Sequence, residues 1–419
     1  MRTPRLIHAL VAWTSLILFG FASAAHAGDA ALTLERAIEL ASSQQPMLAA
    51  AAAQQQAARE RAKAAGQLPD PKLQFGFNNV SVDQPDPFAS DAERMSMTTA
   101  GLMQEFPNRA KRQQQAQRAS ARVGAATAAL ELTRLRVTRD TGLAWTALWQ
   151  ATQARSVLDA QLEEAQRQLE ASTIGYRSDR LRQSAVHTAQ IEWGLLRDRQ
   201  HQLRQQLEDA RAQLARWIGD DAEAVDIGQL PELPDPPSLD TALHAVDRHP
   251  AVLQSRSDTR TASADVALAQ AAYRPDWRVE AMYGYRRPYD DMVSLQFGID
   301  LPLFTRNRQD PALAAARADE IAAEDRVDDL QRDLQRQLRS AYADWNAARD
   351  RLADYDAQLI PAAQARSDSA LAAYRSGSGD IDAVLTARRG QLDIALMRID
   401  LCAMQLRSRL QLRYLLSGE

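Results

Sequence analysis

Two short stretches of the sequence combine a tyrosine with several charged side chains, and their charges are opposite. The candidate residues are Tyr176, Arg180 and Arg182 in the first stretch, and Tyr374, Asp380 and Asp382 in the second. Side chains of these types attract one another electrostatically, whereas none is a typical nucleophile beside a base. One exposed ion pair contributes only about 0–1 kcal/mol. For a single pair, the simpler interpretation is therefore a charged turn exposed to solvent. Such a contact gains weight only where symmetry repeats it.

The residues that usually carry catalysis or hold metals are scattered. The histidines outside the first 30 residues are His187, His201, His244 and His249. They lie far apart in helical composition, so we expect packed or solvated imidazoles, no metal site and no cofactor. Met95, Met97 and Met103 offer thioethers suited to copper or silver, but methionines near a strand more often face lipid or fill gaps. No phosphate-binding glycine loop or serine nucleophile elbow is present, so the sequence does not indicate an enzyme.

Both charged stretches belong to a duplication. One ungapped frame of 198 residues relates Tyr176-Arg177-Ser178 to Tyr374-Arg375-Ser376. Upstream the frame slips by one residue, where 159–162 faces 356–359. A period of this length is too long for a solenoid unit. We therefore predict two structural repeats, 28–230 and 231–419, with helical hairpin tips near 176–186 and 374–384.

The first 27 residues are predicted to be a cleaved signal peptide. Arg2 and Arg5 precede an apolar run, and Ala25-His26-Ala27 matches a cleavage site; a membrane anchor is the alternative. Gly28 follows instead of a cysteine, and the single Cys402 lies far away, so we expect no lipid attachment. Cleavage leaves 48 basic and 54 acidic residues, a balance that does not favour nucleic-acid binding.

Helical periodicity dominates both repeats. No proline occurs between Pro107 and Pro231, and the interior is rich in helix-compatible residues. In the second repeat, apolar residues follow the 3-4 spacing of a coiled coil. They are Leu334, Leu338, Ala341, Trp345, Ala348, Leu352, Tyr355 and Leu359. A continuous helix from Asn108 to Ile174 would be about 100 Å long, so the molecule is predicted to be elongated.

Four short segments alternate with period two, at about 72–80, 95–106, 277–286 and 292–302. Their alternation suits a transmembrane barrel with a wet lumen; a soluble sheet with one face on a core is the alternative. The residues predicted to face lipid are Trp277, Val279, Tyr283, Val293, Leu295, Phe297 and Ile299. Four strands cannot close a barrel, since the smallest have about eight. Three copies would supply twelve strands.

Several further motifs match a known family. They are the stretch Tyr374 to Ser378, Phe106-Pro107, Leu301-Pro302-Leu303-Phe304 and the closing residues 415–418. In their order and duplication the sequence resembles the TolC family of outer membrane efflux proteins. The resemblance implies a mainly α fold with a small β part: long coiled-coil hairpins and four strands per protomer. It also implies a homotrimer in the Gram-negative outer membrane, with a twelve-stranded β-barrel and a twelve-helix periplasmic tunnel.

The resemblance further implies partners, cargo and a gate. The partners are a periplasmic adaptor protein, an inner-membrane RND-type transporter and outer membrane lipid. Residues 68–73, 78–79 and 103–108 look most like the heavy-metal efflux branch, so heavy-metal ions are the expected cargo; organic solutes or type I protein secretion are alternatives. A periplasmic coiled-coil structural protein is the alternative of another class, although it has no use for period-two strands.

The likeness also assigns roles at the hairpin tips, where the family's tunnel closes. Tyr374 matches the family's aperture tyrosine, which helps to hold the closed state. The aperture arginine falls at Gly379, and the aperture carboxylates fall at Ala383 and Thr386, so those links are lost. The opposite charges of the two tips are an expected replacement for them.

Overall fold

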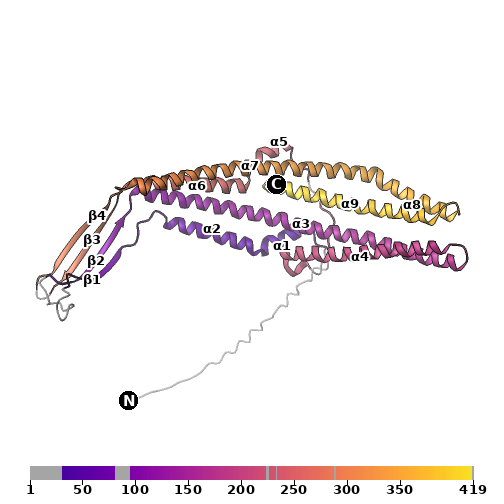
Figure 1. Cartoon of the computed structure of the whole chain (residues 1–419), viewed down its shortest axis with the longest axis horizontal. Helices are drawn as coiled ribbons and strands as arrows, with labels where there is room; N and C mark the ends of the chain where they lie inside the picture. Colours follow the sequence, from indigo (N-terminus) through magenta and orange to yellow (C-terminus); the bar gives the residue numbers. More distant parts are fainter. Residues whose placement is uncertain (1–30, 81–94, 223–225, 233, 287–288, 418–419) are drawn as a thin grey trace, which may run out of the picture.

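The computed structural model describes residues 31–80, 95–222, 226–232, 234–286 and 289–417. The predicted signal peptide and much of the loop after the first strand lie outside these residues. The molecule is an elongated bundle of helices with a small sheet at one end (Figure 1). Both predicted hairpin tips lie at the end opposite the sheet, so the sheet and the tips occupy opposite ends of the long axis of the molecule.

Each half contributes short helices, two strands and a long helical hairpin. The first half comprises α1 (Leu34–Gln44), α2 (Pro46–Ala64), β1 (Lys72–Asn78), β2 (Met97–Phe106), α3 (Arg109–Arg177), α4 (Gln183–Ile218) and the 3₁₀ turn η1 (Gly219–Ala222). The second comprises α5 (Leu239–Ala245), η2 (Val246–Arg248), α6 (Pro250–Ala271), β3 (Asp276–Tyr285), β4 (Met292–Asp300), η3 (Thr305–Asn307), α7 (Gln309–Asp354), η4 (Tyr355–Leu359), α8 (Ile360–Arg375) and α9 (Ile381–Leu415).

The sheet is antiparallel and its strands lie in the order β1-β2-β3-β4. Its centre joins the two halves of the chain, with Phe106 of β2 opposite Trp277 of β3. β1 ends two residues before the predicted limit, because Asn79 takes a left-handed backbone conformation with φ of 57°. β1 and β4 each have only one neighbour, so both edges of the sheet are open.

One difference between the halves lies close to the one-residue slip in the duplication. The first half has a continuous 69-residue helix, α3. The second half breaks between α7 and α8 into the π turn η4, where Ile360 N–H donates to the carbonyl of Tyr355. A π turn accommodates one extra residue, and the second half has one more residue than the first between its Leu359 and Tyr374. Pro361 follows directly, and its missing N–H removes an α-helical hydrogen bond there.

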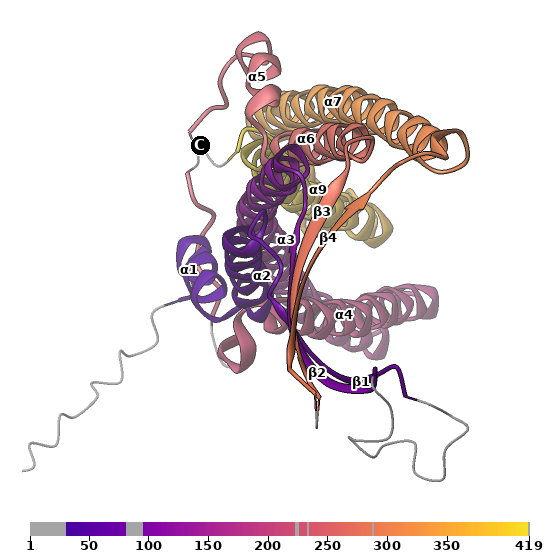
Figure 2. The same ribbon diagram turned by 90° about the vertical axis from the view of Figure 1, so that its left-hand side faces the viewer.

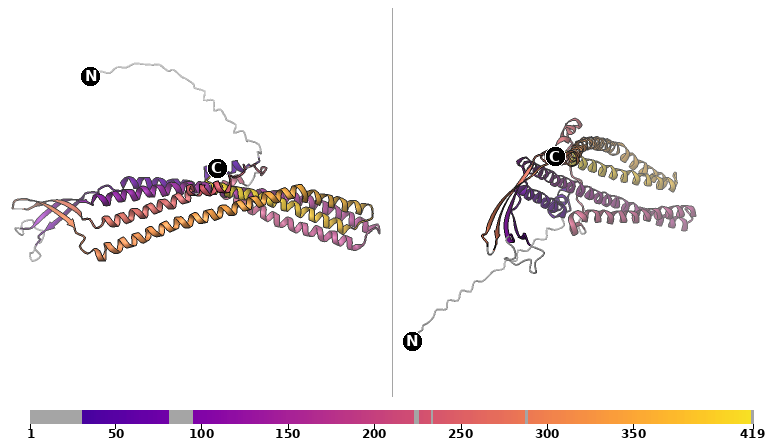
Figure 3. Two further views of the ribbon diagram at one scale, coloured as in Figure 1. Left: turned by 90° about the horizontal axis from the view of Figure 1, so that it is seen from above. Right: turned by 60° about the vertical axis from the view of Figure 1, so that its left-hand side comes forward.

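Two main hydrophobic cores hold the middle of the bundle. The first joins α1, α3, α4 and α9 around Trp145, whose indole N–H donates to the carbonyl of Leu32 at 2.8 Å. The second joins α5, α7 and the end of α9 around Leu338. The predicted seam from Leu334 to Ala348 is buried, whereas Leu359 is 40% exposed just before α8. Seen from above, α3 and α7 run on beyond these cores toward the sheet (Figure 3).

Candidate functional site

The four strands display large apolar side chains on one exposed face. They include Leu73, Phe75, Phe77, Leu102, Trp277, Tyr283, Val293, Leu295, Phe297 and Ile299. Val293 is 80% exposed and Phe297 is 72% exposed. The register pairs Trp277 with Ile299, Val279 with Phe297 and Tyr283 with Val293, so all seven predicted lipid-facing residues share this face. Six of the seven are exposed, and Val279 is half-buried.

The opposite face carries mainly polar side chains, four methionines and several glycines. Its polar members include Gln74, Asn78, Thr99, Glu105, Glu280, Ser294 and Gln296, and its glycines are Gly76, Gly101, Gly284 and Gly298. Glycine reduces crowding and permits a sheet to bend; the sheet is strongly twisted and curved along the bundle axis (Figure 2). Met97 and Met103 lie on this polar face. Of the two expected roles, facing lipid and filling gaps, Met97 takes the second, since it packs over Gly284. The register of β2 determines which face each methionine takes, and the sequence alone did not predict that register.

A polar joint fixes the sheet to the helices. Asp276 begins β3 and accepts hydrogen bonds from the Asn108 backbone N–H at 2.7 Å and the Lys111 ammonium at 2.6 Å. Asn108 is also the N-cap of α3, where its side chain accepts from Lys111 N–H. Beside this joint the rings of Phe106 and Trp277 stack with centroids 4.8 Å apart. Both halves of the duplication therefore meet where strand becomes helix.

The two hairpin tips share one backbone turn but differ in packing. Asp179 and Gly377 occupy equivalent positions, and both are left-handed with φ of 57° and 76°. Tyr374 packs half-buried against a small cluster containing Ile381, Val384 and Leu385, which also contacts Ala185 of the first hairpin. Its counterpart Tyr176 is 46% exposed. The structure thus distinguishes two tyrosines that the sequence treats alike.

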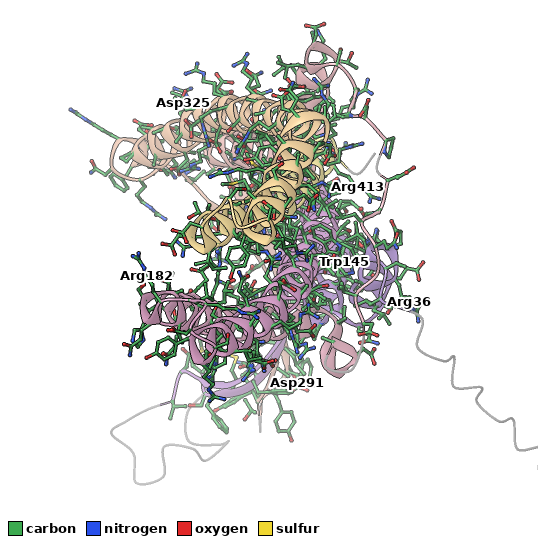
Figure 4. All side chains as sticks on the ribbon, turned by 90° about the vertical axis from the view of Figure 1, so that its right-hand side faces the viewer. Arg36, Trp145, Arg182, Asp291, Asp325 and Arg413 are labelled. Atoms are coloured by element: carbon green, nitrogen blue, oxygen red, sulfur yellow. The ribbon has the colours of Figure 1, made fainter. Side chains whose placement is uncertain are left out.

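The charged residues of the tips do not meet within the described part of this protomer. Asp380 is the N-cap of α9 and Asp382 lies in its first turn, where negative charge suits the helix dipole. Arg182 holds the equivalent position before α4 and makes no capping hydrogen bond. Figure 4 shows Arg182 on the α3–α4 hairpin, apart from the α8–α9 hairpin. No ion pair between described residues joins Arg180 or Arg182 to Asp380 or Asp382.

A group of ion pairs about two turns above the tips does connect the hairpins, and the sequence interpretation missed it. Arg388 of α9 pairs with Glu164 of α3, and Arg389 of α9 pairs with Glu192 of α4. Farther along, Arg199 pairs with Asp393 at 3.0 Å. Burial would raise the pKa of Glu164, but the hydrogen bond and charge of Arg388 hold it below its ordinary value.

A signal for these pairs was present in the helical spacing. Glu192 lies three residues after buried Ala189 and four before buried Leu196. A charge at that position lies on the apolar stripe of α4, and the residue is only 7% exposed. Its carboxylate accepts two hydrogen bonds from Arg389, one of them at 3.2 Å, and this contact raises the pKa of the guanidinium.

The described residues offer no cluster of three or more His, Cys, Asp or Glu side chains that could hold a metal. His249 is fully buried at the start of α6, where its Nδ1 accepts from Ala251 N–H at 3.2 Å and its ring contacts Tyr414 edge-on. Burial lowers its pKa, since the charged form loses hydration, and this outweighs a backbone hydrogen bond at Tyr414. Among the described helices, none combines the length and the apolarity needed to cross a membrane.

Long paired helices, two hairpin tips at the same end and a four-stranded sheet with one apolar exposed face define the class of TolC-like channel proteins. The sequence profile of the outer membrane efflux protein family matches residues 37–220 and 243–418. The chain belongs to this family.

Solved structures support the same fold. The chain is similar to the outer membrane protein VceC from Vibrio cholerae, with 18% identity, a TM-score of 0.79 and coverage of 92% of this chain and 96% of that one. It is similar to the CmeC outer membrane channel of Campylobacter jejuni, with 13% identity, a TM-score of 0.80 and coverage of 99% and 94%. For the outer-membrane channel OprN the values are 18%, 0.78, 92% and 90%. A search of curated protein sequences gave no match.

Proposed function

We propose that this chain forms a homotrimeric channel in the outer membrane of a Gram-negative bacterium and is the exit component of a tripartite efflux pump. The observation that carries the proposal is the sheet, which is apolar and exposed on one face and polar and glycine-rich on the other. Its open edges, β1 and β4, need partners, because an unpaired strand edge is unfavourable in lipid. Two further copies would pair every edge and close a twelve-stranded barrel.

Strand length agrees with this function. β3 contains 10 residues, which extend about 33 Å at ~3.3 Å per residue. Strands of outer membrane barrels tilt by about 35–45°, which leaves a height near the ~25 Å apolar band of such barrels. The apolar face would contact lipid, and the glycine-rich face would line the lumen. A periplasmic coiled-coil structural protein would leave this exposed apolar face without a role.

The helices would then form the periplasmic tunnel, with the tips at its far end. In this arrangement the chain has no energy source of its own. We propose a periplasmic adaptor and an inner-membrane RND-type transporter as partners, and export that is passive through the channel itself. A signal peptide at 1–27, without lipid attachment, would deliver the chain to the envelope.

The gate is proposed to lie at the tips and at the ion pairs above them. Arg182 gains nothing from its own helix, because the N-terminal end of α4 already has a positive dipole. Asp380 and Asp382 lie on the other hairpin and do not reach Arg182 within one protomer. In the proposed trimer, the carboxylates that pair with Arg182 would therefore come from an adjacent subunit. Tyr374, packed in its cluster, would hold the second hairpin closed, whereas exposed Tyr176 would contribute less.

For the cargo we propose heavy-metal ions, because the sequence at residues 68–73, 78–79 and 103–108 resembles the heavy-metal efflux branch of the family. Organic solutes or a type I secreted protein are the alternatives. A susceptibility panel decides between them: deletion of the gene should lower tolerance to transition-metal ions more than tolerance to dyes, detergents or antibiotics. Lost drug tolerance with unchanged metal tolerance would assign the channel to organic solutes.

The test of the channel itself is membrane fractionation followed by the native mass of the detergent-extracted protein. We expect the outer membrane fraction and a protein mass about three times that of the mature chain, since three protomers close the barrel. A soluble periplasmic monomer would overturn both the proposed assembly and its function.

A further inference from the structure

Three methionines from three neighbouring strands lie near one glycine on the polar face of the sheet. Met292 of β4 is the direct register partner of Gly284 of β3. Met97 of β2 lies across the other side, with its Sδ 2.7 Å from the position that a Cβ of Gly284 would occupy. Met282 precedes Gly284 by two residues and so points to the same face. Because Gly284 has no side chain, the space above it is filled by the thioether of Met97.

These methionines fill no hydrophobic core. None belongs to the core clusters formed by the described residues. Met292 is 41% exposed, and Met97 and Met282 are half-buried. The side chain of Asn78 donates a hydrogen bond to the Sδ of Met282 at 3.6 Å, which orients that sulfur by one of its lone pairs. Met97 packs over Gly284 and Met282 packs over Gly101, so soft sulfurs gather on one short stretch of the polar face, where Met292 of the next strand also lies.

We propose that Met97, Met282 and Met292 form a low-affinity binding site for soft monovalent cations, of the Cu(I) or Ag(I) class. Thioethers are soft, uncharged ligands that favour such ions over hard divalent cations. A neutral ligand set need not release protons, so binding would be nearly independent of pH, unlike binding by thiolates or imidazoles. Weak thioether ligation also suits a conduit, because the ion must leave again.

The site rests on the proposed function in one respect, that the polar face lines the lumen. A trimer would then present three copies of the site at one level of the pore. The cation is the cargo of the channel and is not required for its fold.

The experiment is a titration of the purified, detergent-extracted trimer with silver nitrate in chloride-free buffer, followed by NMR of ¹³C-labelled methionine methyl groups. The chain should carry Cys402→Ser, because the free thiol would otherwise compete for silver. After removal of Met1, eight methionines give signals. We expect those of Met97, Met282 and Met292 to shift and those of Met47, Met397 and Met404 to stay. Magnesium at the same concentration should shift none.

Gly284→Ala is the sharpest variant, since it keeps every sulfur but places a methyl group against the Sδ of Met97. It should weaken silver binding by about tenfold, the equivalent of one lost favourable contact. Gly76→Ala is its control: that glycine lies on the same face, and its Cβ would make only an ordinary contact with Thr99 at 3.6 Å. Met97→Leu should weaken binding at least as much as Gly284→Ala.

Equal shifts at all methionines, no shift at any silver concentration tolerated by the protein, or equal binding by Gly284→Ala would each overturn the site. These results are distinct from failure of the proposed function. A trimer in the outer membrane that ignores silver refutes only the cation site, whereas a soluble monomer refutes the channel whether or not it binds silver.

Discussion

The ion pair between Glu192 and Arg389 gives the most direct test of how the two hairpins are held together. Replacing Glu192 by Gln preserves the shape of the side chain and removes its charge. The Glu192 side chain is 10% exposed and that of Arg389 is 55% exposed, so the pair lies between two known limits. Breaking a fully buried pair costs about 3–5 kcal/mol, whereas an exposed pair contributes about 0–1 kcal/mol. We therefore expect a loss of about 1–3 kcal/mol per protomer.

A coupling of this size changes an equilibrium by about 5- to 150-fold. If the second hairpin must separate from the first when the aperture opens, Glu192→Gln should raise the single-channel conductance or open fraction of the proposed trimer in a planar bilayer. The effect should persist at high salt, because a mostly buried carboxylate is screened far less than exposed charges.

Glu208→Gln is the matched control on the same helix. Glu208 is 63% exposed and pairs with Arg211 one turn along α4, at 3.1 Å. This variant should conduct like the wild type. Wild-type conductance of Glu192→Gln in an intact trimer would contradict the gating argument. It would show that the pair joins the two hairpins without affecting closure of the aperture.

Three further predictions concern the lipid face, the tips and the buried imidazole. Leu295→Arg should impair membrane insertion, at about 2–4 kcal/mol for a charge near the midplane, whereas Gln296→Arg on the polar face should insert normally; equal insertion in a membrane assay would disprove the strand register. Asp380→Asn combined with Asp382→Asn should raise conductance at low salt and not at 1 M salt, where the screening length is about 3 Å; equal conductance at low salt would show that these carboxylates are only solvated. His249 has a lowered pKa in the folded state, so the unfolded chain binds its proton first and stability should fall as pH drops below about 6.5; thermal unfolding of His249→Gln should lose that part of the pH dependence.

The strands could be predicted from sequence because a regular alternation of apolar and polar residues is typical of a strand with one apolar and one polar face. Trp277 to Tyr285 and Val293 to Leu301 alternate cleanly, and register then places the aromatic and branched aliphatic side chains from Trp277 to Ile299 on one face. β2 could not be assigned in this way, since Thr98, Ala100 and Gln104 lie on its apolar face and Met97 and Met103 on its polar face. Only pairing with β1 and β3 determines which face each residue takes.

The contacts between hairpins were beyond the sequence interpretation for a different reason. Glu192 and Arg389 are 197 residues apart, and no local pattern relates them. The sequence does show that Glu192 lies on the apolar stripe of its helix. This position predicts a partner of opposite charge, but it does not identify Arg389 as that partner. The tip charges illustrate the opposite case: they are conspicuous in sequence, yet Arg182 and Asp380 make no mutual contact in the protomer.

The two hairpins are related by the duplication, but they are not equivalent. α3 runs unbroken to Arg177, while the second hairpin contains the π turn at Tyr355–Leu359. Asp356 in that turn accepts a hydrogen bond from Arg398 of α9 at 2.6 Å, so the irregular segment is tied to its own return helix. The second hairpin thus has both an internal irregularity and a tyrosine packed at its tip. A helix with a π turn can redistribute its hydrogen bonds more readily than an ideal one. Between two hairpins of common origin, the second therefore has the features of the element that moves and the first those of its support.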